Sequence, residues 1–321
     1  MWRFNSVTTS VVSHQPSVVG HQLSMRYVLI TPAHNEEAFI EKTLAAMVAQ
    51  TVLPERWVIV DDGSTDRTAE IIESYAEHYP WIELLRRQQS ADRSFVGKAN
   101  AFNAGLERVK QLDFDVLGNL DADVSFKSDY MQFLLQKFAE NDDLGVAGTS
   151  MREADYDALK DSFYNDNDVF GACQLFRRKC FEQVGGYTPI KWGGLDWIAV
   201  RTARLNGWQT RSFREKYFYH HRPMGATESS IWKARFDYGR KDYYLGNHPL
   251  WQIFRVAFQI LKRPYGIGGL ILLFGYIHSF MTRMKRPLTP ELVQFHRREQ
   301  LDRLKTLLVN GRRASRFQDP I

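Results

Sequence analysis

The stretch WVIVDDGSTD, residues 57–66, contains the features that decide the fold of this 321-residue chain. The consecutive apolar residues from Trp57 to Val60 have the length and composition of a buried β-strand. Two aspartates and a glycine follow, and Thr65 or Asp66 is placed to cap a helix. A buried strand that leads through a polar turn into a helix is the repeating unit of an α/β sheet.

The same alternation continues on both sides of this stretch. We expect further strands at 27–31, 82–85, 115–120 and 144–149, and helices at 41–50, 98–110 and 130–138. Strands without polar alternation are typical of a parallel, Rossmann-like sheet that helices cover on both faces. Residues 151–225 are less regular and contain an expected helix at 196–206, which Gly207 would close.

The chain changes character after Pro249. We expect an amphipathic helix at 250–261, a nearly all-apolar run at 267–280 and a charged helix at 289–310. The apolar run is shorter than the ~20 residues that a spanning helix needs. Residues 252–321 carry 13 Lys and Arg against 4 Asp and Glu, whereas residues 1–251 have a net charge of −4.

A basic and apolar extension fits an anionic membrane surface better than a nucleic acid. We therefore expect residues 250–286 to bind the cytoplasmic face of a membrane in a peripheral or monotopic way, and we expect no nucleic-acid partner. The expected organisation is a flexible arm (1–25), an α/β domain (26–225, with halves 26–150 and 151–225) and a helical extension (226–321). The arm lacks the features of a secretory signal, and two cysteines suggest no disulfide framework.

Four polar clusters lie at strand ends or open a helix. They are TPAHNEE (31–37), DDGSTD (61–66), GKANA (97–101) and DAD (121–123). Each cluster alone would also fit a solvated strand end. In an open α/β sheet, however, the ligand binds beyond the carboxyl ends of the strands, so the clusters together predict one binding site.

As an ordered set, these clusters resemble the motifs of the family 2 glycosyltransferases, inverting enzymes with the GT-A fold, over residues 26–225. The resemblance implies a nucleotide-sugar donor, most commonly a UDP-sugar, and a divalent metal, Mn²⁺ or Mg²⁺, bound by Asp123. Hard cations prefer carboxylate and phosphate oxygens and neutralise a departing diphosphate. The donor-side candidates are Thr31, Pro32, Ala33, Glu36, Asp61, Asp62, Lys98, Asp121 and Arg222.

On the acceptor side, inversion needs a general base near the attacking hydroxyl. The family commonly has Glu-Asp at the start of a helix, and this chain has Leu195-Asp196, so Asp196 is the candidate base; a helix cap is its alternative role. The family often adds a histidine ligand further on. His220, 24 residues after Asp196, or the adjacent His221 could supply it, and an imidazole favours Mn²⁺.

The resemblance places the acceptor wall near GACQ (171–174) and WGG (192–194). Its candidate residues are Gly171, Trp192, Gly194 and Trp197, although either tryptophan could instead belong to the core. We expect the acceptor to be a lipid-linked molecule or a glycan. Two alternatives stay open: a sugar nucleotidyltransferase, which would need a basic Gly-rich loop where TPAHNEE stands, and a non-catalytic nucleotide-sugar-binding protein.

Overall fold

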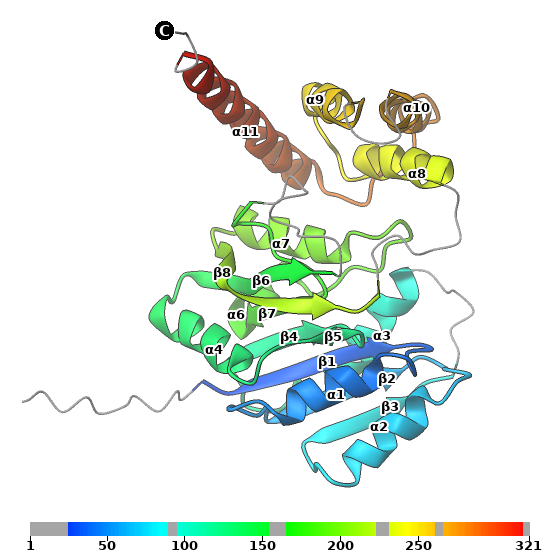
Figure 1. Ribbon diagram of the computed structural model, residues 1–321, viewed down its shortest axis with the longest axis vertical. Coiled ribbons are helices and arrows are strands. Elements are labelled where there is room, and N and C mark those ends of the chain that lie inside the picture. The colour runs from blue at the N-terminus through cyan, green and yellow to red at the C-terminus, as the bar shows by residue number, and fades with distance from the viewer. Residues whose placement is uncertain (1–24, 89–94, 154–164, 223–230, 261–265, 317–321) are drawn as a thin grey trace, which may run out of the picture.

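The computed structural model describes residues 25–88, 95–153, 165–222, 231–260 and 266–316. Within these residues, one eight-stranded sheet runs in the order β3-β2-β1-β4-β7-β6-β8-β5, with helices on both faces and a helical layer at one end (Figure 1). The predicted arm lies outside the described residues, apart from Met25.

The strands are β1 (Tyr27–Ala33), β2 (Arg56–Asp61), β3 (Ile82–Arg86), β4 (Val116–Leu120), β5 (Val124–Ser125), β6 (Leu144–Arg152), β7 (Cys173–Arg177) and β8 (Gln209–His220). The helices against the sheet are α1 (Ile40–Val48), α2 (Thr68–Ala76), α3 (Phe95–Val109), α4 (Tyr130–Glu140), α6 (Arg178–Val184) and α7 (Leu195–Leu205). The strands and helices expected over residues 26–150 are confirmed, with small shifts at their ends. The helix expected at 196–206 is α7, and Gly207 follows it in the left-handed conformation (φ +91°).

Strand β1 shows why the sheet is buried on both faces. Tyr27 and Leu29 belong to a core under α1, α2 and α4, while Val28 and Ile30 belong to a second core under α3, α6 and α7. Successive side chains of a strand point to opposite faces, so an uninterrupted apolar run fills both cores.

The Rossmann-like parallel arrangement is confirmed for the first four strands, and the sheet as a whole is mixed. Strands β1 to β4 are parallel to one another, but β7 lies antiparallel between β4 and β6, and β5 pairs antiparallel with β8. The local sequence of β7 does not specify its direction, because the pairing of a strand depends on partners far away in the chain. The mixed order has a functional consequence: it brings the end of β8 beside the residues that follow β4.

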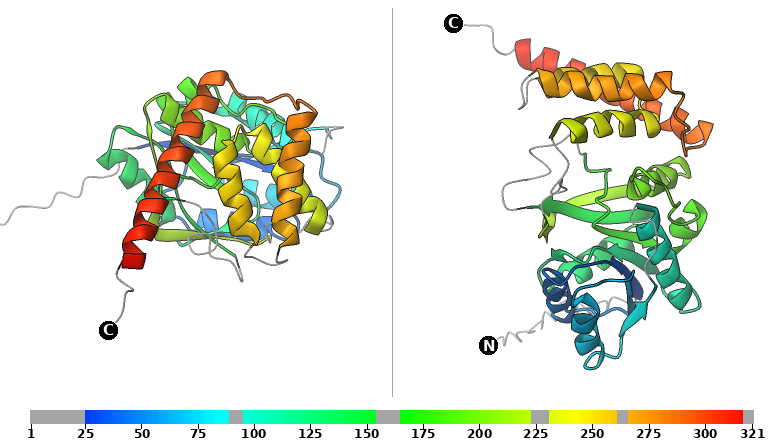
Figure 2. Two further views of the ribbon diagram at one scale, coloured as in Figure 1. Left: turned by 90° about the horizontal axis from the view of Figure 1, so that it is seen from above. Right: turned by 90° about the vertical axis from the view of Figure 1, so that its right-hand side faces the viewer.

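The C-terminal layer consists of α8 (Ile231–Tyr244), α9 (Pro249–Ile260), α10 (Ile267–Met281) and α11 (Pro290–Arg316). Helices α9 and α10 are outermost, and α8 lies between them and the sheet (Figure 2). Helices α8 and α10 cross closely at two glycines. A Cβ added to Gly239 would overlap the carbonyl oxygen of Leu272, and one added to Gly275 would overlap that of Phe236. No helix in the described part of the chain is long and apolar enough to cross a bilayer.

Candidate active site

An acidic cluster forms where β4, β5 and β8 meet. Asp121 follows β4, Asp123 precedes β5, and His220 ends β8 directly opposite Val124. Asp121, Asp123 and His220 each offer one ligand atom, and these atoms lie within 4.8 Å of one another. Two carboxylates and an imidazole fit a divalent cation, and the imidazole favours Mn²⁺ over Mg²⁺.

His220, and not His221, faces this cluster. The Nε2 atom of His220 lies 3.5 Å from Asp123 Oδ1. His221 instead places its Nε2 atom 2.9 Å from Ser125 Oγ and stacks its ring on Phe39. The structure therefore selects His220 as the candidate ligand from the two neighbouring histidines.

Glu153, which the sequence analysis did not select, contacts the other side of His220. It follows β6 directly, and β6 pairs with β8 so that Arg152 lies opposite Tyr219. Its Oε1 atom is 3.0 Å from His220 Nδ1. A carboxylate on Nδ1 holds the tautomer in which the other ring nitrogen, Nε2, is free to coordinate a metal.

Lys98 links the acidic cluster to the first turns of α3. Its ammonium nitrogen lies 2.6 Å from Asp121 Oδ1. Burial by itself would lower the pKa of Lys98, but the charge of Asp121 and the hydrogen bond to it, with Asp196 and Asp123 nearby, hold this pKa above its usual value. Lys98 is thus a fixed positive charge at the cluster and not a solvated surface lysine.

Glu36 and Arg222 form a second charged pair beside Asp123. Arg222 NH2 lies 2.5 Å from Glu36 Oε2, and its Nε atom is 3.7 Å from Asp123 Oδ2. Burial and the nearby charge of Asp123 raise the pKa of Glu36 to about 7, while burial and Asp121 raise the pKa of Asp123. Excess negative charge in a buried site is the environment in which a cation binds favourably.

The two expected donor-side loops are joined by reciprocal hydrogen bonds. The backbone N–H of Asn35 donates to Ser64 Oγ (2.9 Å), and that of Thr65 donates to Asn35 Oδ1 (2.8 Å). Asn35 has a positive φ of 54°, which asparagine tolerates better than most residues. These bonds hold the loops after β1 and β2 together as one wall of the site.

The candidate donor residues of these loops differ in exposure. Asp61 is 5% exposed and accepts a hydrogen bond from Ser64 N (3.1 Å), and Asp62 lies 3.2 Å from the guanidinium of Arg87. Thr31 is fully buried, and its hydroxyl accepts a hydrogen bond from Trp57 Nε1 (2.9 Å). Its side chain therefore serves the core and not the donor pocket, while Ala33 is buried and Pro32 half-buried.

Asp196 reaches the same site from the opposite side. It lies in the first turn of α7, and a Cβ on Gly171 would come within 2.7 Å of the carboxyl carbon of Asp196. The carbonyl of Gly171 accepts a hydrogen bond from Asn119 Nδ2 (2.5 Å), whose side chain also lies 3.5 Å from Asp121 Oδ1. In space, Gly171 and Asn119 therefore lie between Asp196 and Asp121, and both carboxylates border the same site.

The other acceptor-side candidates contact the C-terminal helices. The Trp192 ring is covered by the guanidinium of Arg240 at 4.0 Å, and the side chain of Lys241 packs beside Gly194. Trp197 packs edge-on against His296 of α11, with 4.6 Å between ring centroids. This position makes Trp197 part of the junction between α7 and α11.

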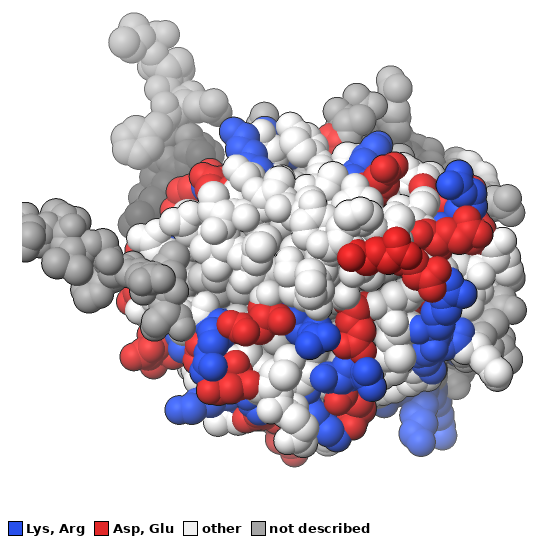
Figure 3. Space-filling view, turned by 90° about the horizontal axis from the view of Figure 1, so that it is seen from below, with Lys and Arg blue, Asp and Glu red and all other residues white. Residues whose placement is uncertain are grey.

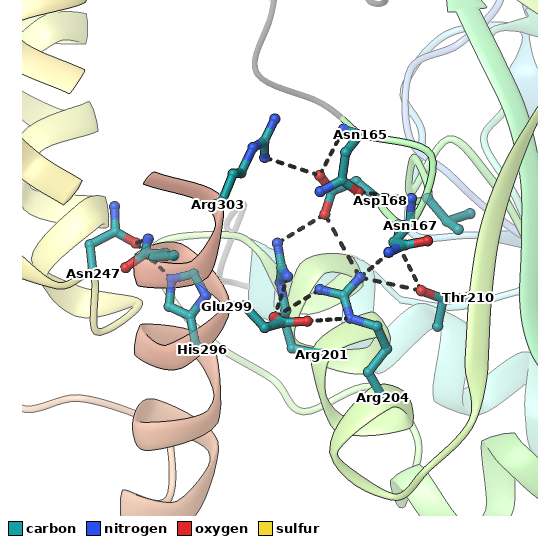
Figure 4. A network of polar contacts seen from close by, with 12 residues as sticks. Asn165, Asn167, Asp168, Arg201, Arg204, Thr210, Asn247, His296, Glu299 and Arg303 are labelled. Atoms are coloured by element: carbon teal, nitrogen blue, oxygen red, sulfur yellow. Dashed lines mark hydrogen bonds and ion pairs between the residues drawn. The ribbon is translucent and has the colours of Figure 1, made fainter. Parts of the chain in front are cut away.

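That junction contains a buried network of charges (Figure 4). Arg201 of α7 binds Asp168 (2.9 Å) and Glu299 of α11 (2.5 Å), and Arg204 binds Glu299 (3.0 Å). About one turn earlier in α11, His296 lies 2.9 Å from Asn247 in the loop before α9. Helix α11 therefore fixes both the helix that carries Asp196 and the loop that leads to the outer helices.

The described sheet and helices form a GT-A fold, and comparisons with solved structures agree on this fold. A mannosyltransferase of Pyrobaculum calidifontis, solved with GDP-Man and Mn²⁺, superposes with a TM-score of 0.53 at 18% identity, over 92% of this chain and 81% of that one. TarS 1–349 of S. aureus, solved with UDP-GlcNAc, gives 0.52 at 14% identity, over 84% and 79%. At such identities the likeness shows the fold alone.

Sequence comparisons match part of the chain. The family model described as glycosyl transferase family 2 matches residues 28–162 of this chain. The poly-beta-1,6-N-acetyl-D-glucosamine synthase of Staphylococcus aureus (strain COL) is 32% identical over 113 residues, which are 35% of this chain and 25% of that protein. The chain thus spans about a quarter of the length of this relative.

Proposed function

We propose that this chain transfers a sugar, with inversion at the anomeric carbon, from a nucleotide-sugar donor to a hydroxyl of a lipid-linked or glycan acceptor. The observation that carries the proposal is the placement of Asp196 opposite Asp121, across Gly171 and Asn119. One side of the site gathers groups that suit a metal and a diphosphate, and the other presents a single carboxylate.

The reaction is a single displacement. The acceptor oxygen forms a bond to the anomeric carbon while the bond from that carbon to the diphosphate oxygen breaks, and the electron pair of that bond leaves with the diphosphate. Asp196 takes the proton of the attacking hydroxyl. Lys98 and Arg222 are placed to pair with the diphosphate, since each already contacts a carboxylate of the cluster.

Asp121, Asp123 and His220 would hold the divalent cation, and Glu153 would orient His220. The cation would supply charge neutralisation for the leaving diphosphate. We propose a UDP-sugar as the donor, supported by the resemblance of the loops around Asp61 and Asp62 to nucleotide-binding loops and by the UDP-GlcNAc in the TarS structure. The GDP-Man of the mannosyltransferase structure makes a GDP-sugar the second donor to test.

The two alternatives make different demands on the site. The reaction of a sugar nucleotidyltransferase takes place at phosphorus and needs no base at Asp196. A binding protein catalyses no reaction and needs no base at all. The loop after β1 bears the acidic residues Glu36 and Glu37 and no basic residue, which is unfavourable for a nucleotidyltransferase.

Substitution of the base tests the proposal. Asp196→Asn should lower the rate of transfer about 10²–10⁴-fold, the usual contribution of a general base, because amide nitrogen cannot take the proton. Donor affinity, measured by calorimetry with UDP-sugars and GDP-sugars and Mn²⁺, should stay within a factor of about 2. Retained transfer would remove Asp196 from the mechanism, and transfer that survives a chelator would contradict the metal assignment.

A further inference from the structure

Helices α9 and α10 expose many large apolar side chains on their outer face. We use "outer face" for these exposed large apolar side chains: Leu250, Ile253, Ile260, Ile267, Leu270, Phe274, Ile277, Phe280 and Met281. Their exposure runs from 36% to 75%. The two helices lie side by side at the end of the molecule farthest from α2 and β3 (Figures 1 and 2).

The opposite sides of the same helices are packed against the molecule. Leu272, Gly275 and Tyr276 of α10 are buried, and the glycine contacts between α8 and α10 bring the two backbones together. A Cβ on Gly269 would come within 2.9 Å of the Val256 carbonyl oxygen, so α9 and α10 are also closely packed. The outer face is therefore one side of a well-packed layer and not a set of loosely attached helices.

The charge around the outer face has one sign. From Tyr243 to Pro290 the sequence contains six basic residues and no acidic residue. Arg283 and Lys285, just beyond α10, are exposed, and within the described residues neither forms an ion pair. The lower end of the molecule carries Lys and Arg interspersed with Asp and Glu instead (Figure 3).

From these observations we infer that the outer face docks into an anionic bilayer, with α9 and α10 lying in the plane of the interface. Apolar side chains of such helices enter the boundary between headgroups and acyl chains, and basic residues bind anionic headgroups. A second copy of the chain is a poorer occupant, because pairing two outer faces about a two-fold axis would bring like positive charges together.

Docking would also orient the acceptor side of the site. Helix α8, directly beneath the outer helices, places Arg240 on Trp192 and Lys241 beside Gly194, two residues before Asp196. The docked layer and the acceptor-side loop are therefore in contact. The inference of a membrane-borne acceptor, presented from the bilayer, rests on the proposed function and makes it more specific. The docking itself does not depend on that function.

Flotation of the full chain with lipid vesicles tests the docking. We expect binding to vesicles of phosphatidylcholine mixed with phosphatidylglycerol, and weaker binding to phosphatidylcholine alone. The double substitution Ile253→Asp with Leu270→Asp should lower the affinity at least about tenfold, because two charges replace apolar anchors. Lys285→Ala should lower it about fivefold for the anionic vesicles only.

The matched control is Leu53→Asp, which changes a 45%-exposed leucine between α1 and β2. It should leave vesicle binding unchanged. Melting temperature and donor affinity should be the same in all variants, so a loss of binding can be separated from a loss of folding or of the proposed function. Docking is overturned if the full chain binds neither kind of vesicle, if Leu53→Asp weakens binding equally, or if the chain is a dimer that the Ile253 and Leu270 substitutions dissociate.

Discussion

The acidic cluster at the strand ends and the outer face of α9 and α10 are opposite kinds of surface in one chain. The first concentrates carboxylates in a buried place, and the second leaves large apolar side chains exposed on a segment, residues 243–290, that contains basic residues and no acidic one. Neither arrangement helps the chain to fold, since buried like charges repel and exposed apolar groups gain nothing from folding. Each therefore points to something that the chain binds, a cation with a diphosphate in one case and a bilayer in the other.

Glycine marks both regions but for different reasons. Gly171 leaves room for the carboxylate of Asp196, whereas Gly275 lets α10 approach the backbone of α8. If the two regions work separately, the same substitution at each position should impair one property and leave the other unchanged.

Gly171→Ala should have the largest effect. The new methyl group would occupy the space of the Asp196 carboxylate and displace it, and a misplacement of about 1 Å can cost 10²-fold in rate. We expect turnover to fall about 10²-fold while vesicle binding is kept. The control is Gly185→Ala, where a Cβ meets no other atom within 4 Å, and which should change only stability. Equal turnover in both variants would contradict the placement of Asp196.

Glu153→Gln is expected to weaken Mn²⁺ binding about 10–100-fold, the usual effect of removing a carboxylate that orients a ligating histidine. Electron paramagnetic resonance of free Mn²⁺ measures this affinity without any turnover. Glu140→Gln, at the exposed end of α4, is the matched control and should bind Mn²⁺ as the unchanged protein does. An unchanged affinity in Glu153→Gln would show that Glu153 does not position His220.

Gly275→Ala should have the opposite effect to Gly171→Ala and weaken vesicle binding. The methyl group would meet the Phe236 carbonyl, and because backbone yields less easily than a side-chain tip, we expect a loss of about 1–3 kcal/mol in stability. Vesicle binding should weaken while donor affinity persists, as measured by flotation and calorimetry on the same sample. Loss of donor affinity together with vesicle binding would show that the regions are not separable.

The smallest effect concerns pH and the junction between the two regions. Burial lowers the pKa of His296 to about 3, so below its usual value of 6.5 the unfolded chain takes up a proton that the folded chain does not. Stability should therefore fall as pH decreases from 6.5 towards 3, by at most about 1.4 kcal/mol per pH unit from this group. His296→Gln should flatten urea-unfolding midpoints between about pH 5 and 7; an unchanged slope would contradict this assignment.

Much of this architecture could be predicted from sequence because the signals are local. Uninterrupted apolar runs gave β1, β2 and β4, and the spacing of apolar residues gave α4, α7 and α9. The direction of β7 could not be read, since it depends on pairing with strands far away in the chain. Helix α8 was missed because aromatic and charged residues alternate around it without a clear apolar side.

The candidate site also contains residues that local sequence patterns predict and residues that they do not. Asp121, Asp123 and His220 were selected from motifs and do come together. Glu153 was missed because its role depends on the register of β6 against β8, which no local pattern reveals. Thr31 and Trp197 were also selected by position in a motif; Thr31 bonds to Trp57 and the half-buried Trp197 packs on His296, contacts that no motif specifies.

The contact of α11 with α7 has a practical consequence for anyone who shortens this chain. A cut before Pro290 would remove Glu299 and leave the guanidinium groups of Arg201 and Arg204, each about 10% exposed, with Asp168 as their remaining acidic neighbour. Uncompensated positive charge would then lie on α7, the helix that carries Asp196. A truncated catalytic fragment should therefore keep residues to the end of α11, or replace both arginines with uncharged side chains of similar volume.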